Sequence, residues 1–135
     1  MAYKIIDIEG VGEVYAEKLT AEGIIKVSDL LEKCAKPAGR KALAEATGIS
    51  DKLILRWTNH ADLFRIKGVG PQFSELLEAA GVDTVKELKH RNAENLFAAC
   101  NEVNEKKNLC NRVPAIKELS KMIEQAKEME PAIFY

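Results

Sequence analysis

Membrane and disulfide signals are missing from this chain of 135 residues. No apolar run approaches the roughly 20 residues that a helix needs to cross a bilayer, and the residues after Met1 lack the apolar stretch of a secretory signal. The three cysteines are odd in number, which argues against a disulfide framework. We therefore expect a cytoplasmic protein with reduced thiols and no membrane partner.

Motifs for catalysis and for metal binding are also absent. The chain has no Gly-x-Ser-x-Gly, no P-loop and no His-Glu-x-x-His. Its two histidines, His60 and His90, have no cysteine or histidine at the spacing of a zinc site, and Cys100 and Cys110 are too far apart for a zinc knuckle. The scattered carboxylates are expected at helix ends or on the surface: Asp7, Asp51 and Asp62. The sequence thus predicts no enzyme, no cofactor and no metal.

A basic excess is missing too. The chain carries 20 basic and 21 acidic side chains, for a net charge of −1. Domains that bind duplex DNA usually have a positive excess, because neutralising phosphates supplies most of their affinity. Any nucleic-acid binding by this chain is therefore expected to be local and weak.

Helix signals dominate what remains. Apolar residues make up 47% of the chain and charged residues 30%, as in an ordinary globular protein. No stretch of four to eight residues alternates apolar and polar side chains between turn residues, as a strand would. We predict an all-α fold.

A repeated segment organises the sequence. Ile8-Glu9-Gly10-Val11-Gly12 recurs as Ile66-Lys67-Gly68-Val69-Gly70, an offset of 58 residues, and the following residues stay in register without a gap. The further equivalent pairs are Tyr15 and Phe73, Leu19 and Leu77, Gly23 and Gly81, Ile24 and Val82, Val27 and Val85, and Leu30 and Leu88. Since each repeat alone would bury a marginal core, we expect repeats of about 1–64 and 65–130 in one compact domain of residues 1–135, with an apolar tail at 131–135.

Capping residues predict where the helices begin and end. A helix after Gly12 is expected to stop at Gly23, and one after Pro37 at Gly48, because glycine accepts the left-handed conformation that follows a helix. The residues expected to start helices are Ser28, Pro37, Ser50, Thr84, Asn92 and Pro114. The Ser50–Phe64 helix should connect the repeats, with Trp57 in the core, and a C-terminal helix should end before Pro131. Tyr15 and Phe73 are also expected in the core.

The repeated turns resemble a known motif. Gly-Val-Gly-Glu-Val-Tyr-Ala and Gly-Val-Gly-Pro-Gln-Phe-Ser are similar to the helix-hairpin-helix motif, with the small residues Ala16 and Ser74 four positions after the second glycine. The segment 48–66 further resembles an uncharacterised bacterial family of tandem helix-hairpin-helix proteins. The resemblance implies two fused repeats in a pseudo-two-fold, SAM-like helical bundle. It also implies hairpin amides that contact phosphates of duplex DNA without reading sequence.

The two turns differ in charge. Glu9 and Glu13 flank the first, and a carboxylate in the first helical turn competes with phosphate, since it is itself stabilised there by ~0.3–1 kcal/mol. Lys67 and Arg65 lie at the second, where Pro71 and Gln72 follow Gly70 and no acid blocks the turn. We therefore expect the second turn to bind more strongly. The candidate nucleic-acid-binding residues are Arg65, Lys67, Gly68, Val69, Gly70 and Gln72, together with Gly10, Val11 and Gly12 in the first turn.

Two alternatives stay open. Helix-hairpin-helix units also serve as protein contact surfaces, so a scaffold or a homodimerising adaptor without nucleic-acid binding is the rival to DNA binding. The tail Ile133-Phe134-Tyr135 either folds back on the core or contacts a partner. Two basic sets near helix ends are read as solvated side chains that could also widen a phosphate-binding face: Lys33, Lys36, Arg40 and Lys41, and Lys86, Lys89, His90 and Arg91.

Overall fold

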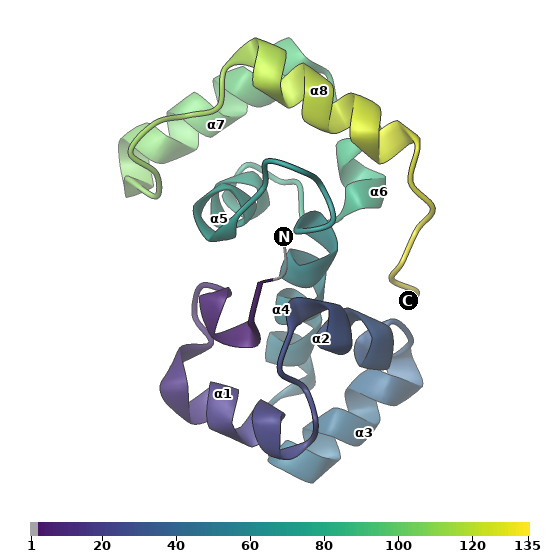
Figure 1. Ribbon diagram of the computed structural model, residues 1–135. Helices are drawn as coiled ribbons and strands as arrows, with labels where there is room; N and C mark the ends of the chain where they lie inside the picture. Colours follow the sequence, from purple (N-terminus) through teal and green to yellow (C-terminus); the bar gives the residue numbers. More distant parts are fainter. Residues whose placement is uncertain (1–2) are drawn as a thin grey trace. The chain divides into compact units, whose positions relative to one another are not determined.

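The computed structural model describes residues 3–135, and within that range the fold is all-α, as predicted (Figure 1). A short 3₁₀ helix and eight α-helices form, and the only β-type pairing among the described residues is one isolated bridge between Lys4 and Lys26. In chain order the elements are η1 (Ile5–Asp7), α1 (Gly12–Ala21), α2 (Val27–Cys34), α3 (Pro37–Thr47), α4 (Asp51–Leu63), α5 (Pro71–Ala79), α6 (Val85–Leu88), α7 (Ala93–Lys107) and α8 (Ile116–Lys127).

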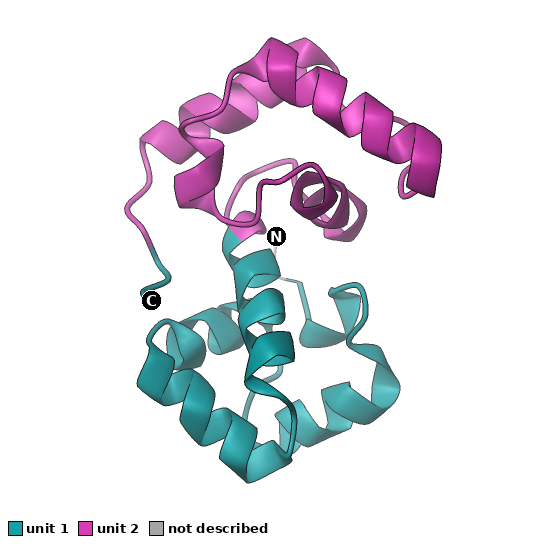
Figure 2. Ribbon diagram, turned by 180° about the vertical axis from the view of Figure 1, so that it is seen from behind, with its two compact units in different colours: residues 1–62, 132–135 teal, residues 63–131 magenta. Residues whose placement is uncertain are grey.

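The chain divides into two compact units (Figure 2). Unit 1 comprises the residues up to Asp62 together with Ala132–Tyr135, and unit 2 comprises Leu63–Pro131. The boundary after Asp62 lies two residues before the repeat boundary expected after residue 64. Of the tail expected at 131–135, residues 132–135 group with unit 1, whereas Pro131 belongs to unit 2.

The interior of unit 1 is aliphatic around a single indole. Trp57 on α4 is fully buried, which confirms its predicted place in the core, and Leu19 and Leu30 are likewise inaccessible. The Tyr15 ring lies 5.1 Å from the Trp57 ring, between centroids, at a tilted angle. Such tilted aromatic pairs add about 0.5–1.5 kcal/mol beyond the area that they bury. Tyr15 itself is half-buried, so it lies at the edge of the core rather than inside it.

Unit 2 has a core of its own, built mainly from α5, α7 and α8. The helices α7 and α8 pack side by side (Figure 1), α5 packs on α7, and the short α6 packs on α8. Half-buried Phe73 on α5 packs against this core. Its fully buried aliphatic members include Leu63, Leu76, Val82, Leu88, Leu96 and Leu119.

Close contact between α2 and α3 depends on one glycine. A Cβ at Gly39 would overlap the backbone carbonyl oxygen of Lys33, on the neighbouring helix. Since backbone cannot move aside as a flexible side chain can, the two helices approach this closely only because residue 39 has no side chain. Position 97, the equivalent at the offset of 58 residues, is phenylalanine, so this close approach is particular to unit 1.

Most predicted helix ends are confirmed. Gly23, two residues after α1, and Gly48, directly after α3, have φ of +83° and +76°. The side chains of Thr84 and Asn92 accept hydrogen bonds from the N–H groups of Glu87 and Asn95, at 3.2 and 3.0 Å. Ser50 also caps, since the Leu53 N–H donates to its Oγ at 3.2 Å.

The prediction for Ser28 is wrong. Helix α2 already begins at Val27, so Ser28 lies inside its first turn and the cap comes from the next residue. The Asp29 carboxylate accepts the N–H groups of Lys26 and Ile25 at 2.9 and 3.2 Å, and these bonds lower the pKa of Asp29. A carboxylate at this position reaches back to the N–H groups at and before the helix start, which is the N3 half of a capping box.

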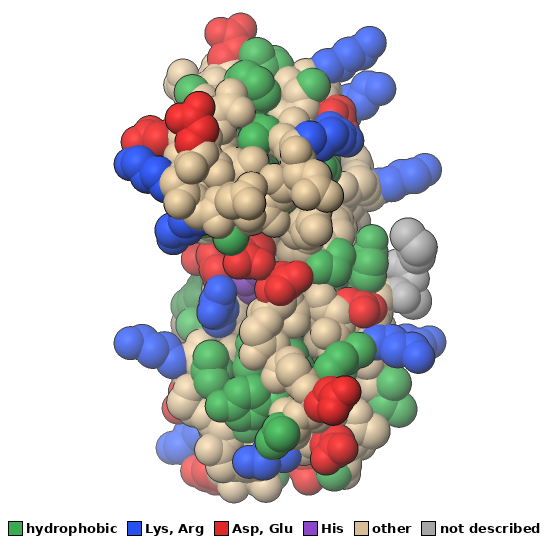
Figure 3. Space-filling model, turned by 90° about the vertical axis from the view of Figure 1, so that its left-hand side faces the viewer, with side chains coloured by type: hydrophobic (Ala, Val, Ile, Leu, Met, Phe, Trp, Pro, Cys, Tyr) green, Lys and Arg blue, Asp and Glu red, His purple; other side chains and the backbone are tan. Residues whose placement is uncertain are grey.

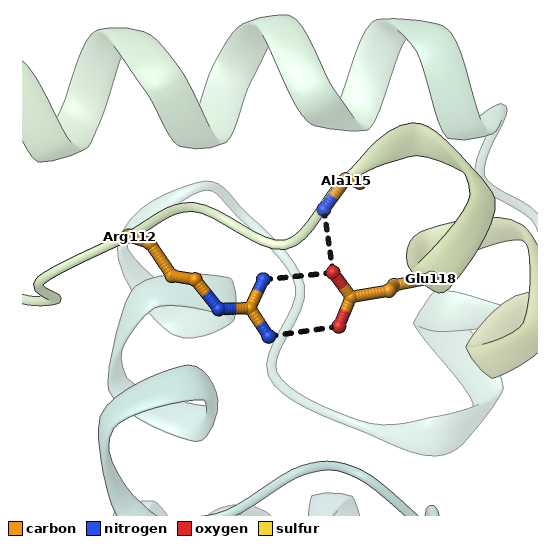
Figure 4. A network of polar contacts seen from close by, with 3 residues as sticks. All are labelled: Arg112, Ala115 and Glu118. Atoms are coloured by element: carbon orange, nitrogen blue, oxygen red, sulfur yellow. Dashed lines mark hydrogen bonds and ion pairs between the residues drawn. The ribbon is translucent and has the colours of Figure 1, made fainter.

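Helix α8 begins two residues later than Pro114, at Ile116, and an exposed ion pair organises its start (Figure 4). Two parallel hydrogen bonds join Arg112 to the Glu118 carboxylate, Nη1 to Oε1 at 2.7 Å and Nη2 to Oε2 at 3.0 Å. Oε1 also accepts the Ala115 N–H at 3.1 Å. The bonds from Arg112, then the one from Ala115, lower the pKa of Glu118 to about 2.

Candidate nucleic-acid interface

The two glycine turns have the same pattern of backbone hydrogen bonds. In each turn, two backbone N–H groups, three residues apart, donate to the carbonyl of the third residue before them. The four bonds are Ile8 N–H to Ile5 O at 3.1 Å, Val11 N–H to Ile8 O at 3.2 Å, Ile66 N–H to Leu63 O at 3.1 Å and Val69 N–H to Ile66 O at 3.1 Å. The offset of 58 residues therefore holds in backbone bonding as well as in sequence.

The correspondence continues past the first helix of each unit. Residues Gly23 and Gly81 both adopt positive φ, +83° and +97°, and the residues after them donate back into the helix. The equivalent bonds are Ile24 N–H to Leu19 O at 3.0 Å and Val82 N–H to Leu77 O at 2.8 Å. Both units thus return the chain from a short helix in the same way.

The turns diverge at their second glycine. Gly10 and Gly68 are alike, with φ of +93° and +100°. Gly12, however, has φ of +67°, whereas Gly70 has φ of −113° and ψ of −168°, an extended conformation. Extended backbone is what the residue before a proline favours, and Pro71 follows Gly70. The second turn therefore needs one left-handed glycine where the first needs two.

The second turn is held from α8. The Lys67 N–H donates to Gln125 Oε1 at 2.9 Å, and Gln125 Nε2 donates to the Lys67 carbonyl at 3.1 Å. Val69 is buried, and Met122 Cε lies 3.5 Å from where a Cβ on Gly68 would be. The turn backbone is thus fixed on both sides before any ligand arrives.

Several donors of the second turn point to no acceptor in the protein. The N–H groups of Gly68, Gly70 and Gln72 have no hydrogen-bond partner within residues 3–135, and no side chain caps α5. The Lys67 side chain is exposed and makes no ion pair among the described residues. Unpaired N–H groups at a helix start, together with the helix dipole, favour an anion. Gln72 is exposed beside them.

Two residues expected at this site have other roles. The Val69 N–H is occupied by the Ile66 carbonyl, so of the three turn amides only those of Gly68 and Gly70 remain available. Half-buried Arg65 donates from Nη2 to the Glu130 carbonyl at 2.8 Å, just beyond the end of α8. Its charge lies near the turn, but part of its hydrogen-bonding capacity is committed to this carbonyl.

The first turn is acidic, as its sequence indicates. Gly10 and Gly12 are exposed, and Val11 is buried with its N–H bonded to Ile8. The carboxylates of Glu9 and Glu13 are exposed, with Glu13 in the first turn of α1. They occupy the positions of Lys67 and Pro71 in the second turn, so the two turns share their backbone hydrogen bonds but differ in charge.

The sequence did not predict the roles of two residues: Gln125 was not a candidate, and Arg40 was expected to be a solvated member of a basic set. Arg40 is 7% exposed and donates to three carbonyls: Nη1 to Cys34 at 2.9 Å and Ala35 at 3.1 Å, and Nη2 to Phe134 at 2.9 Å. It therefore caps α2 and holds the last residues of the chain rather than widening a basic face. Nothing in the local sequence distinguishes it from its exposed neighbour Lys41.

The C-terminal residues fold back on unit 1. Ile133 is buried, and the Phe134 N–H donates to the Ala35 carbonyl at 2.7 Å. The Tyr135 hydroxyl hydrogen-bonds to Asn59 Oδ1 at 3.2 Å. Of the two expectations for this segment, folding back is the one that Ile133 follows, while the side chains of Phe134 and Tyr135 stay largely exposed.

The chemistry available elsewhere is limited. Among residues 3–135 no three histidine, cysteine or acidic side chains are grouped as metal ligands, and no helix in that range is long and apolar enough to cross a membrane. All three cysteines are buried free thiols, and burial raises the pKa of Cys100 to about 11. Asp62 lies near the end of α4, as expected of a helix-end group, but its side chain is buried rather than on the surface.

Comparisons with known proteins place most of the chain in a family. Residues 9–129 match the family model described as a domain of unknown function, DUF4332. No curated protein and no solved structure matches the chain.

Proposed function

Since the chain belongs to this family, whose description assigns no activity, we propose a function from the geometry of the second turn: non-enzymatic, sequence-independent binding of duplex DNA through backbone phosphates. In this proposal the two units are helix-hairpin-helix repeats, and the second turn is the principal binding site. The phosphate contacts come from the Gly68 and Gly70 amides, the Lys67 ammonium and the Gln72 side chain.

The observation that carries the proposal is the unpaired, uncapped start of α5. Three N–H donors of one turn lack an acceptor, no carboxylate lies in the first helical turn, and Lys67 is exposed next to them. A phosphate oxygen accepts such N–H groups without any reference to base sequence. The bonds from Gln125 fix the turn in advance, so little conformational entropy is lost when the anion binds.

Binding is expected to be weak and sensitive to salt. A net charge of −1 supplies no long-range attraction for DNA, so affinity depends on the few local contacts. If about four phosphates are neutralised, the association constant should fall roughly 100-fold between 50 and 200 mM salt. Arg65 adds to the local potential from beside the turn.

A titration of fluorescently labelled duplex tests the proposal. Anisotropy is measured at 50, 100 and 200 mM salt for the native protein and for Lys67→Glu. We expect the variant to bind at least tenfold more weakly at 50 mM, with a salt slope reduced by about one or more, because it loses a phosphate contact and gains a repulsive charge. The matched control is Lys52→Glu, which makes the same charge change at an exposed residue of α4.

The acidic turn offers a gain-of-function variant. Glu13→Lys removes the carboxylate at the start of α1 and should strengthen duplex binding several-fold, since the first turn has the same early backbone bonds as the second. Absence of duplex binding at 50 mM salt, or equal loss in Lys67→Glu and Lys52→Glu, would refute the proposal. It would leave the rival expectation, a scaffold or homodimerising adaptor that does not bind nucleic acid.

A further inference from the structure

A second surface, on unit 1, differs from the principal DNA site proposed on unit 2, although it includes Glu13, which flanks the first turn. An open groove of about 530 Å³ lies along α1, and we name it the α1 groove. Its lining residues are Ile6, Glu13, Ala16, Glu17, Thr20 and Ala21. Ile6 comes from η1, which packs against α1, and the other five follow one side of α1 at helical spacing.

Aliphatic side chains in and beside the groove are exposed to solvent. Ile6 is 42% exposed, and Val14, one residue beyond Glu13, is 68% exposed. Ala16 and Ala21 add small side chains that leave room above the helix backbone. A single exposed aliphatic residue means little, but exposed aliphatic residues beside a groove mark a contact surface.

The charge of the groove has one sign. Glu13 and Glu17 line it, no cation does, and neither carboxylate has a hydrogen bond or ion pair within residues 3–135. Figure 3 faces the side on which α1 lies in Figure 1, and its lower part shows hydrophobic side chains gathered with acidic side chains beside them. A partner for this surface needs apolar side chains and positive charge.

Unit 2 shows what covers the corresponding helix. There α7 packs on α5, and the α7–α8 linker reaches the same helix, because Cys110 Sγ donates to the Gln72 carbonyl at 3.3 Å. Leu109 and Val113 of this linker also pack on the core. In unit 2, therefore, α7 and the α7–α8 linker both contact α5.

Unit 1 lacks this cover. Helix α3 has 11 residues against 15 in α7, and its linker to α4 spans residues 48–50, against 108–115 in unit 2. Helix α1 packs on η1 and makes no comparable contact with α3. Because α3 and its linker are shorter, α1 lacks the contact with a neighbouring helix that α7 gives α5 in unit 2.

We propose that the α1 groove docks a basic amphipathic helix from another protein. The helix would place apolar residues at i, i+3, i+4 and i+7 on Ile6, Ala16 and Ala21, with Lys or Arg side chains next to Glu13 and Glu17. Apolar contact supplies the affinity, and the two unpaired carboxylates select a cationic partner over an acidic one. The chain then has one site for an anion in unit 2 and one for a cationic helix in unit 1.

The test uses a defined probe. A fluorescein-labelled 18-residue peptide with Leu at the four spaced positions and Lys elsewhere is titrated against the full chain, in parallel with a peptide that carries Glu in place of Lys. We expect the Lys peptide to bind with a Kd on the order of 10 µM, and the Glu peptide at least tenfold more weakly. Double substitution Glu13→Lys with Glu17→Lys should reverse this preference.

Controls separate the groove from acidity in general. Glu32→Lys with Glu45→Lys makes the same charge change at exposed residues of α2 and α3 and should leave peptide binding within about twofold. Ile6→Ser should weaken binding about fivefold at unchanged helix content by circular dichroism, because it removes part of the apolar lining of the groove. Ile6→Ser should also leave duplex binding unchanged, so the two proposals fail independently.

Three outcomes overturn the inference. One is no binding of the Lys peptide at 200 µM. Another is equal loss of binding in the Glu13/Glu17 and Glu32/Glu45 double variants, which would mean unspecific attraction to acidic surface. The third is a dimer by light scattering that Ile6→Ser dissociates, which would assign the groove to a second copy of this chain.

Discussion

Gln125 binds both backbone groups of Lys67, accepting its N–H at 2.9 Å and donating to its carbonyl at 3.1 Å. A side-chain amide has one acceptor and two donors, so it can replace the partner strand or helix that a loop residue lacks. The pairing joins α8 to the second glycine turn and makes the shape of that turn depend on a residue far along the chain.

Replacing Gln125 with alanine should therefore loosen the second turn. We expect a loss of about 1 kcal/mol in the free energy of unfolding, since the two bonds are exposed and each contributes modestly. Duplex binding should weaken about two- to fivefold, because the turn must then be ordered when the phosphate binds. Chemical denaturation and anisotropy measure the two effects, and Glu124→Ala, at an exposed neighbour on α8, is the control.

Gly39→Ala should be costly although the substitution favours helices in general. The new Cβ would overlap the Lys33 carbonyl oxygen, so α2 and α3 must separate. We expect a loss of about 1–3 kcal/mol in the free energy of unfolding, the usual effect of overpacking. Ala38→Gly, at the preceding, exposed position of α3, is the control, because it changes helix propensity without adding a Cβ. An unchanged or higher melting temperature for Gly39→Ala would show that the helices yield easily.

Arg40→Met should release the C-terminal residues from unit 1. The substitution keeps much of the aliphatic volume but leaves three carbonyls, those of Cys34, Ala35 and Phe134, without the guanidinium donor. We expect a loss of about 2–4 kcal/mol in the free energy of unfolding, together with faster hydrogen exchange at the Phe134 amide. Lys41→Met, on the exposed side of α3, should change the stability by less than about 0.5 kcal/mol.

Acid should weaken the start of α8 in a defined range. The pKa of Glu118 is lowered from 4.5 to about 2 by Arg112 and Ala115, so the stabilisation is fully present above about pH 5. It is lost as the pH falls from about 4.5 through 2, where the carboxylate becomes protonated in the folded state. We expect a carbon-detected NMR titration of the Glu118 carboxyl to give a midpoint near 2. The melting temperature of Glu118→Gln should fall below the native value at pH 7 and meet it near pH 2.

The three thiols should be inert in the folded protein. Burial raises the pKa of Cys34, Cys100 and Cys110, that of Cys100 to about 11, so the reactive thiolate is scarce near neutral pH. We expect negligible reaction with a thiol reagent such as DTNB over minutes at pH 8, and three equivalents after denaturation with guanidinium. Rapid labelling of one thiol in the native state would identify a local opening of the fold.

Local features of the fold could be predicted from the sequence because they depend on neighbouring residues. Glycine at positive φ after a helix, Thr84 and Asn92 as caps, and Pro37 in the first turn all act within four residues of their position. Apolar periodicity placed Trp57 correctly, since burial follows the helical stripe. The prediction for Ser28 failed because α2 begins one residue earlier, at Val27, and Asp29 bonds the Lys26 N–H at the helix start from inside the first turn.

Long-range polar contacts lay beyond sequence reasoning. Gln125 and Arg40 are ordinary residues of exposed-looking helical segments, and their importance arises only when the fold brings a backbone carbonyl or amide beside them. The α1 groove was missed for a related reason, because it results from the four-residue difference between α3 and α7 and from the shorter linker. The candidate phosphate donors could be located from the sequence. The hydrogen bond from the Val69 N–H to the Ile66 carbonyl could not, because it depends on the three-dimensional shape of the turn.

The extended conformation of Gly70 makes this position useful for identifying whatever approaches the second turn. With φ of −113° and ψ of −168°, its backbone suits any amino acid, unlike Gly12 with φ of +67°. A photo-reactive amino acid or a labelled cysteine can therefore be installed at residue 70 without forcing a left-handed side chain. Cross-linking from that point in living cells would capture the molecule in contact with the turn, be it a nucleic acid or a protein.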